Sequence, residues 1–491
     1  MKKTAVIVSA FTALAGVSAF ADATPVNPSA TSVTLAEDKE YYLTGNTTKV
    51  TTFKMESGSV LDLKGFNFSS SAQYGGHLAI DANTMITNSE SAAATVSITA
   101  QSAFNQDWYP FQNVVFGGNI ALHVKGKSGK EYKGFLGVAN THTGGTTLES
   151  YRGENESAGS VTTKTPRFNS ADAFGQKALT LKGGSHLNYI GSSDITTPWT
   201  ALASELSDGQ TACTNIIDNS SDKNFKITGA VDVAADSVLA VRYNNNIGYR
   251  HIWLEGPLAG VHGTLLVADS TANSRVYLDN TDGMPDGTLA LASGTQVWIN
   301  KAEKDETYQI GALETTGDIV AENDAKLVYV KNLRLNLRVG NEKDTTFFGH
   351  INKSDDGKND IGLEKIGTGT LRLGGANTYS RHTYISGGVL EVIGAGTLGA
   401  GGYITFKGGT LAYGDGAETP YTIDYSDRIA KSTTAPISVD TKSNSITWAT
   451  ALAASNTAGL TKKGSGTLTP SARWRGRASA VPLMSNGEKG V

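Results

Sequence analysis

A pattern that recurs along the chain constrains its fold more than any other feature. Its fullest copy reads Leu363-Glu-Lys-Ile-Gly-Thr-Gly-Thr-Leu-Arg-Leu373 and continues through Gly375-Ala-Asn-Thr-Tyr379 to Gly387-Gly-Val-Leu-Glu-Val392. The middle of this pattern recurs upstream as Val138-Ala-Asn-Thr-His-Thr-Gly-Gly-Thr-Thr147, and its beginning recurs downstream as Leu460-Thr-Lys-Lys-Gly-Ser-Gly-Thr-Leu468. Self-similar units are typical of repeat architectures, in which each unit buries its apolar face by stacking on its neighbours.

Many other segments of the chain alternate apolar and polar residues at period two. Examples are Ser59–Leu63, Ala178–Leu181 and Tyr403–Phe406, and the last two precede glycine pairs. Period-two runs bounded by glycine indicate short strands. Of the 491 residues 56 are Gly, and only 18% are charged, which suits many strands joined by tight turns. The sequence predicts an all-β solenoid, a parallel β-helix. A β-sandwich is the alternative, but it does not require one turn pattern at three distant places.

The chain begins with features of a secretory signal peptide. Lys2 and Lys3 precede an apolar run over residues 5–17, and small residues at Ala19 and Ala21 suit a cleavage site. We predict a signal peptide over residues 1–21 with cleavage after Ala21, and we expect no membrane span in the rest of the chain. The Pro/Ser/Thr-rich start of the mature chain predicts a linker and N-terminal cap over residues 22–52, ahead of a β-helix over residues 53–469.

The string Leu-x-Lys-x-Gly-x-Gly-Thr-Leu-x-Leu-x-Gly-Ala-Asn-Thr-Tyr over residues 363–379 resembles the autotransporter-associated β-strand repeat. We place copies at about 138–191 and 361–413, with the start of another at 460–469. The second copy departs from the family at Arg381-His382, where two glycines are expected. The resemblance implies a right-handed β-helix, the passenger region of an exported bacterial surface protein, with a role in adhesion or cell-surface contact.

The C-terminal segment differs from the rest of the chain. The resemblance implies a translocator barrel after the passenger, whereas residues 470–491 form a short segment that carries Arg473, Arg475 and Arg477. We interpret this segment as an atypical basic tail and hypothesise that a frameshift or gene-model error produced it. A genuine disordered tail is the alternative.

Polysaccharide-cleaving enzymes also use β-helices, so their acidic signatures require a test. Asn280-Thr281-Asp282 matches the Asn-x-Asp element of polygalacturonases, and Asp355-Asp356 provides paired carboxylates. The His-Gly and Arg-x-Lys elements that should follow are missing in that order, so we predict that the chain is not an enzyme. Asp279, Asp282 and Asp286 also resemble an acidic calcium loop, although they lack the downstream Glu of an EF-hand. They are weak calcium candidates, and we predict no other metal and no cofactor.

Clustered aromatic residues are the best candidates for ligand contact. Trp108 and Tyr109, Trp199, and Trp253 lie in segments that we expect to form loops leaving the coil, where a solenoid keeps its binding surface. Such rings either stack on sugars or cover the core beneath a loop.

These observations lead to one functional prediction with two alternatives. We predict an exported β-helix passenger, displayed on the cell surface or outer membrane or released, that acts as a rigid scaffold in adhesion. We expect a glycan or a host or cell-surface protein as its partner. Nucleic acid is excluded as a partner because the net charge is −4 and no basic block lies within the repeat region. The alternatives are a polysaccharide lyase or hydrolase, and a structural matrix component that self-associates.

Overall fold

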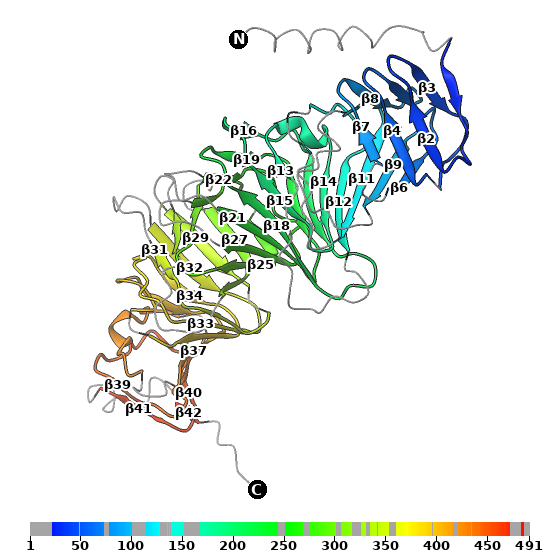
Figure 1. Ribbon diagram of the computed structural model, residues 1–491. Coiled ribbons are helices and arrows are strands. Elements are labelled where there is room, and N and C mark those ends of the chain that lie inside the picture. Colours follow the sequence, from blue (N-terminus) through cyan, green and yellow to red (C-terminus); the bar gives the residue numbers. More distant parts are fainter. Residues whose placement is uncertain are drawn as a thin grey trace.

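The structure, a computed structural model, forms one elongated stack of β-strands that runs from the N-terminal to the C-terminal end (Figure 1). It describes residues 22–48, 50–72, 78–100, 114–127, 135, 137, 139–151, 167–243, 251–268, 275–281, 283–300, 306–316, 326–329, 334–340, 342–352, 360–394, 396–415, 421–433, 435–471 and 483–485. Every strand pairing in these residues that joins two named strands is parallel, and the strands form seven sheets.

Three sheets begin nearest the N-terminus, and they have five, three and seven strands. The first comprises β1 (Thr24–Val26), β3 (Glu40–Leu43), β5 (Val60–Asp62), β8 (Thr84–Thr87) and β10 (Val114–Phe116). The second comprises β2 (Ser32–Leu35), β4 (Thr52–Met55) and β7 (Leu78–Ile80). The third comprises β6 (Phe68–Ala72), β9 (Ala94–Ala100), β11 (Ile120–Lys127), β12 (Thr146–Tyr151), β14 (Leu179–Lys182), β17 (Ala201–Glu205) and β20 (Ala230–Val233).

Two long sheets occupy the middle of the stack. One comprises β13 (Arg167–Phe168), β15 (His186–Tyr189), β18 (Cys213–Asn219), β21 (Ser237–Tyr243), β23 (Thr264–Ala268), β25 (Met284–Leu291), β27 (Glu306–Thr315), β29 (Arg334–Val339), β32 (Asp360–Lys365), β34 (Thr383–Ile385) and β36 (Ile404–Phe406). The other comprises β16 (Ile195–Thr196), β19 (Phe225–Ile227), β22 (His251–Leu254), β24 (Arg275–Leu278), β26 (Gln296–Ile299), β28 (Lys326–Tyr329) and β31 (His350–Asn352).

The last two sheets close the C-terminal end. One comprises β30 (Thr345–Phe347), β33 (Thr370–Leu373), β35 (Val389–Val392), β37 (Thr410–Tyr413), β38 (Ile437–Asp440), β40 (Leu460–Lys463) and β42 (Leu483–Ser485). The other pairs β39 (Ser445–Trp448) with β41 (Thr467–Pro470). The described residues contain two short 3₁₀ helices and no α-helix; the two are η1 (Ala171–Phe174) and η2 (Ser426–Arg428).

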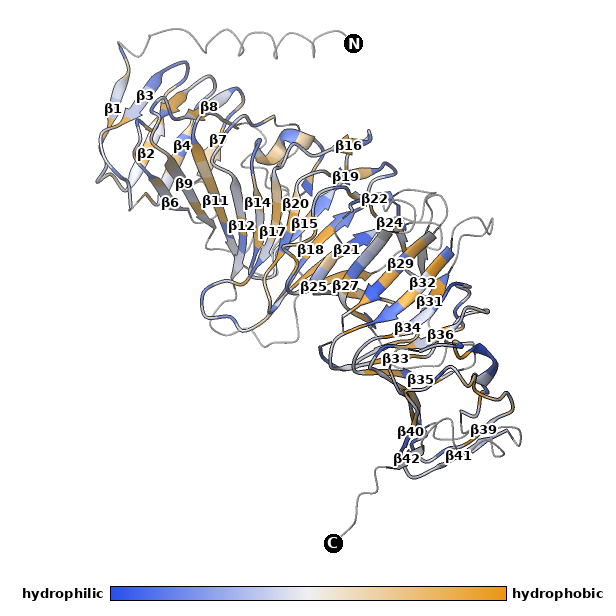
Figure 2. Ribbon diagram, turned by 180° about the vertical axis from the view of Figure 1, so that it is seen from behind, coloured by the Kyte–Doolittle hydropathy of each residue, from blue (hydrophilic) through white to orange (hydrophobic). Residues whose placement is uncertain are grey.

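The period-two pattern of the sequence explains why these segments form strands around one core. In β23, Leu265 and Val267 are fully buried, while Thr264 and Leu266, which alternate with them, are only partly buried. Successive residues of a strand point to opposite faces, so the apolar set of each strand enters the interior. Each such Leu or Val contributes about 1.5–3 kcal/mol relative to an exposed side chain. In Figure 2 hydrophobic and hydrophilic residues alternate along the strands from one end of the stack to the other.

The prediction of an all-β parallel solenoid is confirmed, and its right-handed coiling stays a prediction. The boundaries at both ends differ from those expected. The stretch 22–52 already contains β1, β2 and β3 and the first residue of β4, and β1 pairs in parallel with β3. The expected entry linker is therefore part of the first coils. At the other end β42 pairs with β40, so the segment expected to be a tail contributes a strand. The signal peptide predicted over residues 1–21 lies outside the described residues. None of the helices in the described part of the chain is long and apolar enough to cross a membrane.

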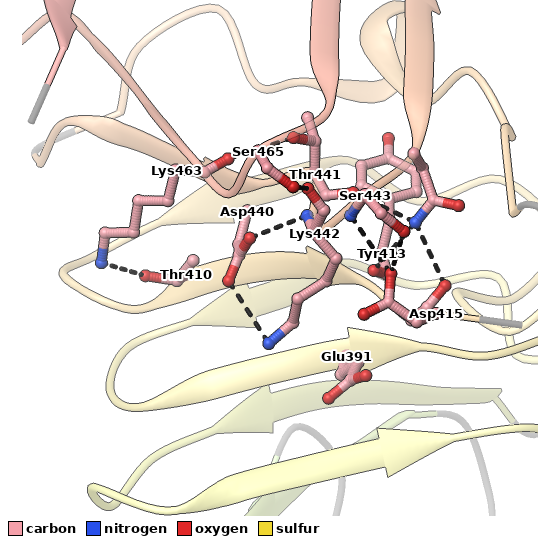
Figure 3. A network of polar contacts seen from close by, with 12 residues as sticks. Glu391, Thr410, Tyr413, Asp415, Asp440, Thr441, Lys442, Ser443, Lys463 and Ser465 are labelled. Carbon is pink, nitrogen blue, oxygen red and sulfur yellow. Dashed lines mark hydrogen bonds and ion pairs between the residues drawn. The ribbon is translucent and has the colours of Figure 1, made fainter. Parts of the chain in front are cut away.

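Polar contacts also connect successive coils, as Figure 3 shows near the C-terminal end. Asp415 follows β37 and accepts hydrogen bonds from both the backbone N–H (3.1 Å) and the hydroxyl (2.6 Å) of Ser443 in the next coil. These two bonds lower the pKa of Asp415. Lys463 on β40 reaches past β38 to donate to the Thr410 hydroxyl on β37 at 3.3 Å. Such contacts connect coils that already share backbone hydrogen bonds.

Trp199 is 1% exposed and packs inside the coil, so the expectation that it lies in an exposed loop is wrong. Its ring centroid lies 6.2 Å from that of Phe168, 5.9 Å from Phe174 and 6.2 Å from Phe225. Large aromatic side chains remove so much apolar surface from water that a turn residue of this kind folds inward whenever the interior has room. The alternative interpretation, that the ring covers the core, holds for Trp199.

We expect Trp199→Ala to lower the free energy of unfolding by about 3–5 kcal/mol, because truncation of a buried aromatic ring leaves a cavity. Urea unfolding followed by circular dichroism measures this loss. The matched control is Trp253→Ala, since Trp253 is only partly buried. Equal unfolding midpoints for the two variants would contradict the placement of Trp199 in the core.

Candidate functional site

Two corners of the solenoid, each built on one copy of the repeat, have the same hydrogen-bonding scheme. We call them the first repeat corner (residues 139–147) and the second repeat corner (residues 376–384). The first corner leads into β12 and the second leads into β34, and both strands belong to long sheets. Because the corners lie in different parts of the stack, their shared geometry follows from the repeated residues rather than from a shared neighbourhood.

A buried asparagine is the centre of each corner. Asn140 accepts a hydrogen bond from the backbone N–H of Phe116 at 2.9 Å and donates to the carbonyl of Ala173 at 2.6 Å. Asn377 likewise accepts from the N–H of Ile351 and donates to the carbonyl of Thr397, both at 2.6 Å. One partner lies in the preceding coil and the other in the following coil. Each amide therefore connects three successive coils and satisfies backbone groups that would otherwise be buried without partners.

The backbone bonds around the two asparagines match as well. In each corner the asparagine N–H donates to the following coil, and the N–H of the next residue donates to the preceding coil. The carbonyl of the residue after that accepts from an N–H of the following coil. These matched bonds are Asn140 N to Asp172 O (3.1 Å) and Asn377 N to Gly396 O (3.2 Å), Thr141 N to Phe116 O (2.9 Å) and Thr378 N to Ile351 O (3.1 Å), and Gln176 N to His142 O (3.2 Å) and Ala400 N to Tyr379 O (2.7 Å). The corner is thus a repeated clamp across coils.

The residue two positions after the asparagine occupies the same place in both corners, although its type differs. His142 Nε2 lies 2.9 Å from the hydroxyl of Thr146, and the Tyr379 hydroxyl lies 2.9 Å from that of Thr383. Both rings are fully buried. In each case the hydroxyl partner is four residues further on, so one pocket accepts either ring.

The two corners differ at the glycine pair of the repeat. A Cβ at Gly144 would lie 2.4 Å from the carbonyl oxygen of Ile120 in the preceding coil, so no side chain fits there. In the second corner Arg381 and His382 occupy the two glycine positions. The following coil contributes Gly402, where a Cβ would lie 1.9 Å from the Arg381 carbonyl oxygen. Glycine is therefore required in the following coil at this contact.

Lys365, the lysine of the repeat, is fully buried at the end of β32. Its ammonium donates to the carbonyls of Ile366, Gly367 (3.1 Å), Gly340 (3.4 Å) and Gly387 (3.5 Å), and the last two belong to the preceding and following coils. Burial lowers the pKa of Lys365 to about 8, against the opposing effect of Glu342 and Asp344. Lys462 occupies the same position in the third copy and donates to the carbonyl of Gly464, two residues on, as Lys365 does to Gly367.

A protein-family model matches the two segments that form these corners. The model of the passenger-associated-transport-repeat matches residues 135–150 and 363–392. The first range includes the whole first repeat corner, and the second includes the whole second corner and Lys365. The chain carries passenger-associated-transport repeats. The resemblance to autotransporter passenger repeats is thereby confirmed. A search of curated proteins found no match, and neither did a search of solved structures.

Of the residues predicted to contact a ligand, Trp253 lies on the outer face of a long sheet. Its ring stacks on that of Tyr277 with centroids 3.8 Å apart and planes at 4°, and Tyr277 meets Trp298 edge-on at 5.7 Å. Lys226 covers the Trp253 ring at 5.0 Å, and the Arg275 guanidinium covers that of Trp298 at 3.6 Å. The faces of these rings therefore contact one another or cationic side chains. Contact of Trp253 with a ligand stays a prediction; Trp108 and Tyr109 lie outside the described residues.

The acidic candidates have other partners where the structure describes them. Asp279 accepts from the Asn300 amide at 3.3 Å, and Asp286 lies 3.8 Å from His262. Asn280 is buried, and its side-chain oxygen accepts from the Gly283 N–H and the Tyr308 hydroxyl. Asp282, Asp355 and Asp356 lie outside the described residues, among which no group of three or more His, Cys, Asp or Glu side chains is placed to hold a metal. Calcium binding stays a prediction.

A groove of about 460 Å³ crosses the outer face of the sheet that contains β12, beside the first repeat corner. Its lining combines small residues with hydroxyl-bearing and charged ones: Thr95, Ala121, Leu122, His123, Gly144, Gly145, Thr146, Thr147, Ala178, Thr180, Lys182 and Glu205. The volume is in the range of small-ligand sites in proteins. Sequence reasoning missed the groove because its residues come from five strands that are distant in the chain.

A buried carboxylate supports one wall of the groove. Glu149 accepts hydrogen bonds from His123 Nε2 (2.8 Å), the Lys125 ammonium (3.0 Å) and the Ser207 hydroxyl (2.9 Å). Burial acts to raise the pKa of Glu149, but the bonds from Lys125, Ser207 and His123 outweigh it and lower that pKa. Because Nε2 of His123 is held by Glu149, the imidazole is fixed in place at the groove. Lys182 lies 3.9 Å from the exposed Asp208, a loose contact that leaves its charge available to the groove.

We expect the native chain to become more stable as pH increases from about 8 to 10.5, and Lys365→Met to lose this rise. The folded chain releases the Lys365 proton near pH 8 and the unfolded chain near 10.5, so the unfolded chain binds more protons in this window and unfolding becomes less favourable. Urea midpoints at pH 7.5 and 9.5 measure this. A parallel rise in both proteins would show that Lys365 is not the group responsible.

Proposed function

We propose that this chain is the passenger portion of an exported, autotransporter-like surface protein and acts as a rigid scaffold in adhesion or cell-surface interaction. The observation that carries the proposal is the presence of two passenger-associated-transport repeats as matching clamps within one continuous parallel β-solenoid. This combination fits an autotransporter passenger scaffold. The signal peptide expected at residues 1–21 is consistent with export.

The scaffold role follows from how the coils are joined. Strands of successive coils exchange backbone hydrogen bonds, and the corner asparagines and Lys365 add side-chain bonds to the coils on either side. Most backbone groups are therefore satisfied by neighbouring coils, and bending would break several bonds at once. Such a rod holds a surface feature at a defined distance from the cell.

For the contact surface we propose the groove beside the first repeat corner, with a glycan as its ligand. The hydroxyls of Thr95, Thr147 and Thr180 and the charged groups of Lys182 and Glu205 suit a polyhydroxylated molecule, since each donates or accepts hydrogen bonds. A few placed polar groups on a concave surface are the usual basis of small-ligand recognition. One positive and one negative side chain give no strong preference for an ionic ligand.

Surface display is tested with antibodies raised against residues 22–469. We expect them to label intact cells of the source bacterium or to detect the chain in the medium, because a passenger is exported across the envelope. The measurement is immunofluorescence of intact cells against permeabilised cells, together with blots of the medium. Signal confined to permeabilised cells would overturn the proposed export.

Glycan binding is tested by applying the full mature chain to a glycan array and repeating the measurement with Lys182→Ala/Glu205→Gln. We expect the double variant to lose at least about tenfold in affinity, because each lost charged hydrogen bond costs about 1.5–3 kcal/mol. Lys343→Ala/Glu314→Gln is the matched control, since this loose ion pair (3.9 Å) also removes one lysine and one glutamate and lies outside the sheet that carries the groove. Trp253→Ala enters the same assay. Absence of binding, or equal losses in both double variants, would contradict the groove as the site.

A further inference from the structure

The two repeat corners carry different titratable side chains at the same buried position. His142 in the first corner and Tyr379 in the second make the same bond to a threonine hydroxyl four residues further on, at 2.9 Å in both cases. The surrounding backbone bonds also match. Within one chain, a buried ring that can gain a charge in mild acid can therefore be compared with one that cannot.

The neighbours of the His142 ring are neutral. Strand β10 contributes the edge of Phe116 (centroids 6.1 Å apart), and β12 contributes Thr146. The segment that includes η1 contributes Gly175, whose Cα hydrogen faces the ring closely enough that a Cβ there would lie 2.7 Å from His142 Cε1. The carboxylate of Asp172 on η1 accepts from the Gln176 amide instead. In the described part of the chain, no charged side chain contacts the ring.

The hydrogen bonds also determine which nitrogen carries the proton. The Thr146 hydroxyl donates its one hydrogen to the carbonyl of Phe174 at 2.9 Å. It must therefore accept from His142, so Nε2 is protonated and Nδ1 is not. Nδ1 is buried and has no hydrogen-bond partner among the described residues. A proton added in acid would go to Nδ1 and place a charge in the core, where the Phe116 carbonyl offsets the loss of hydration only in part and no carboxylate of the described residues contacts the ring.

We propose that His142 makes the first repeat corner an acid-sensitive lock between coils, which opens on protonation while the second corner, with Tyr379, stays closed. Opening would separate the coil of residues 139–151 from that of residues 171–182. Because Gly144–Thr147 also line the groove, the same event would reshape that surface. The inference concerns the stability of the corner and does not depend on what the groove binds.

The direction of the effect follows from the pKa of His142. Burial lowers it from 6.5 to about 4, against a smaller opposing effect of the Phe116 carbonyl. The opened ring takes up its proton near pH 6.5 and the closed ring only near 4, so opening becomes more favourable as pH falls through this window. The opening constant should rise about tenfold for each pH unit below 6.5, or about 100-fold by pH 4.5.

Carboxylates titrate in a different window. Glu149 on β12, Asp218 and Glu364 all have pKa values lowered from ordinary values of 4.5, 3.8 and 4.5. Their contribution to stability is present above those values and is lost only at lower pH. An effect between pH 6.5 and 5 therefore reports on histidine rather than on these groups.

The experiment is hydrogen exchange by mass spectrometry on the full mature chain at pH 7 and pH 5, corrected for the intrinsic pH dependence of exchange. Peptides covering residues 139–151 report on the first corner, and peptides covering residues 376–385 report on the second. We expect faster corrected exchange at pH 5 in the first corner only. His142→Tyr should abolish this acid response, and Tyr379→His should create one in the second corner.

An acid response of the first corner that survives in His142→Tyr would overturn the proposal, as would its absence in the native chain. If His142→Tyr does not fold, Tyr379→His decides alone, because failure of the second corner to gain an acid response would then overturn it. The reciprocal pair also separates a local effect from general acid destabilisation, which would accelerate exchange in both corners of every variant.

Discussion

Every feature of this molecule depends on the hydrogen bonding of one coil to the next. A single coil of short strands has nothing to bury its apolar face against, and its backbone groups point along the axis with no partners of their own. Stacking solves both problems together: Leu265 and Val267 enter a continuous core while β23 pairs with β21 on one side and β25 on the other. Stability is therefore distributed along the stack rather than located in one place.

The corners are where stacking is most difficult, because the chain turns and the strand ladder is interrupted. The repeat places buried polar side chains at those points. Asn140 and Asn377 carry a donor and an acceptor on one planar group, which suits a side chain between two coils. Lys365 does the same with donors only, toward carbonyls of its own and both adjacent coils. Such groups also favour one register, since a shifted coil would leave them buried and unsatisfied.

The sequence was sufficient for the strands and insufficient for the corners. Ala178–Leu181 and Tyr403–Phe406 alternate in polarity, and β14 and β36 lie within one residue of them, because the side-chain period is a local property. The role of Asn140 is not local, since its partners are 24 residues before it and 33 after it. The sequence predicts a surface loop at Trp199 for a related reason. A Thr-Pro-Trp turn has the same letters whether the ring points outward or toward Phe225 in the following coil.

The differences between the two repeat copies show which parts of the pattern the corner physically requires. The asparagine is kept in both, and so is the threonine that meets the buried ring. The glycine pair is replaced by Arg381-His382 in the second corner, where the His382 ring stacks on that of Tyr403 with centroids 5.6 Å apart. The buried ring is His142 in one corner and Tyr379 in the other, because the pocket constrains only the position of one polar atom and the volume of the ring that carries it. Packing therefore accepts either residue, and only their response to a proton distinguishes them.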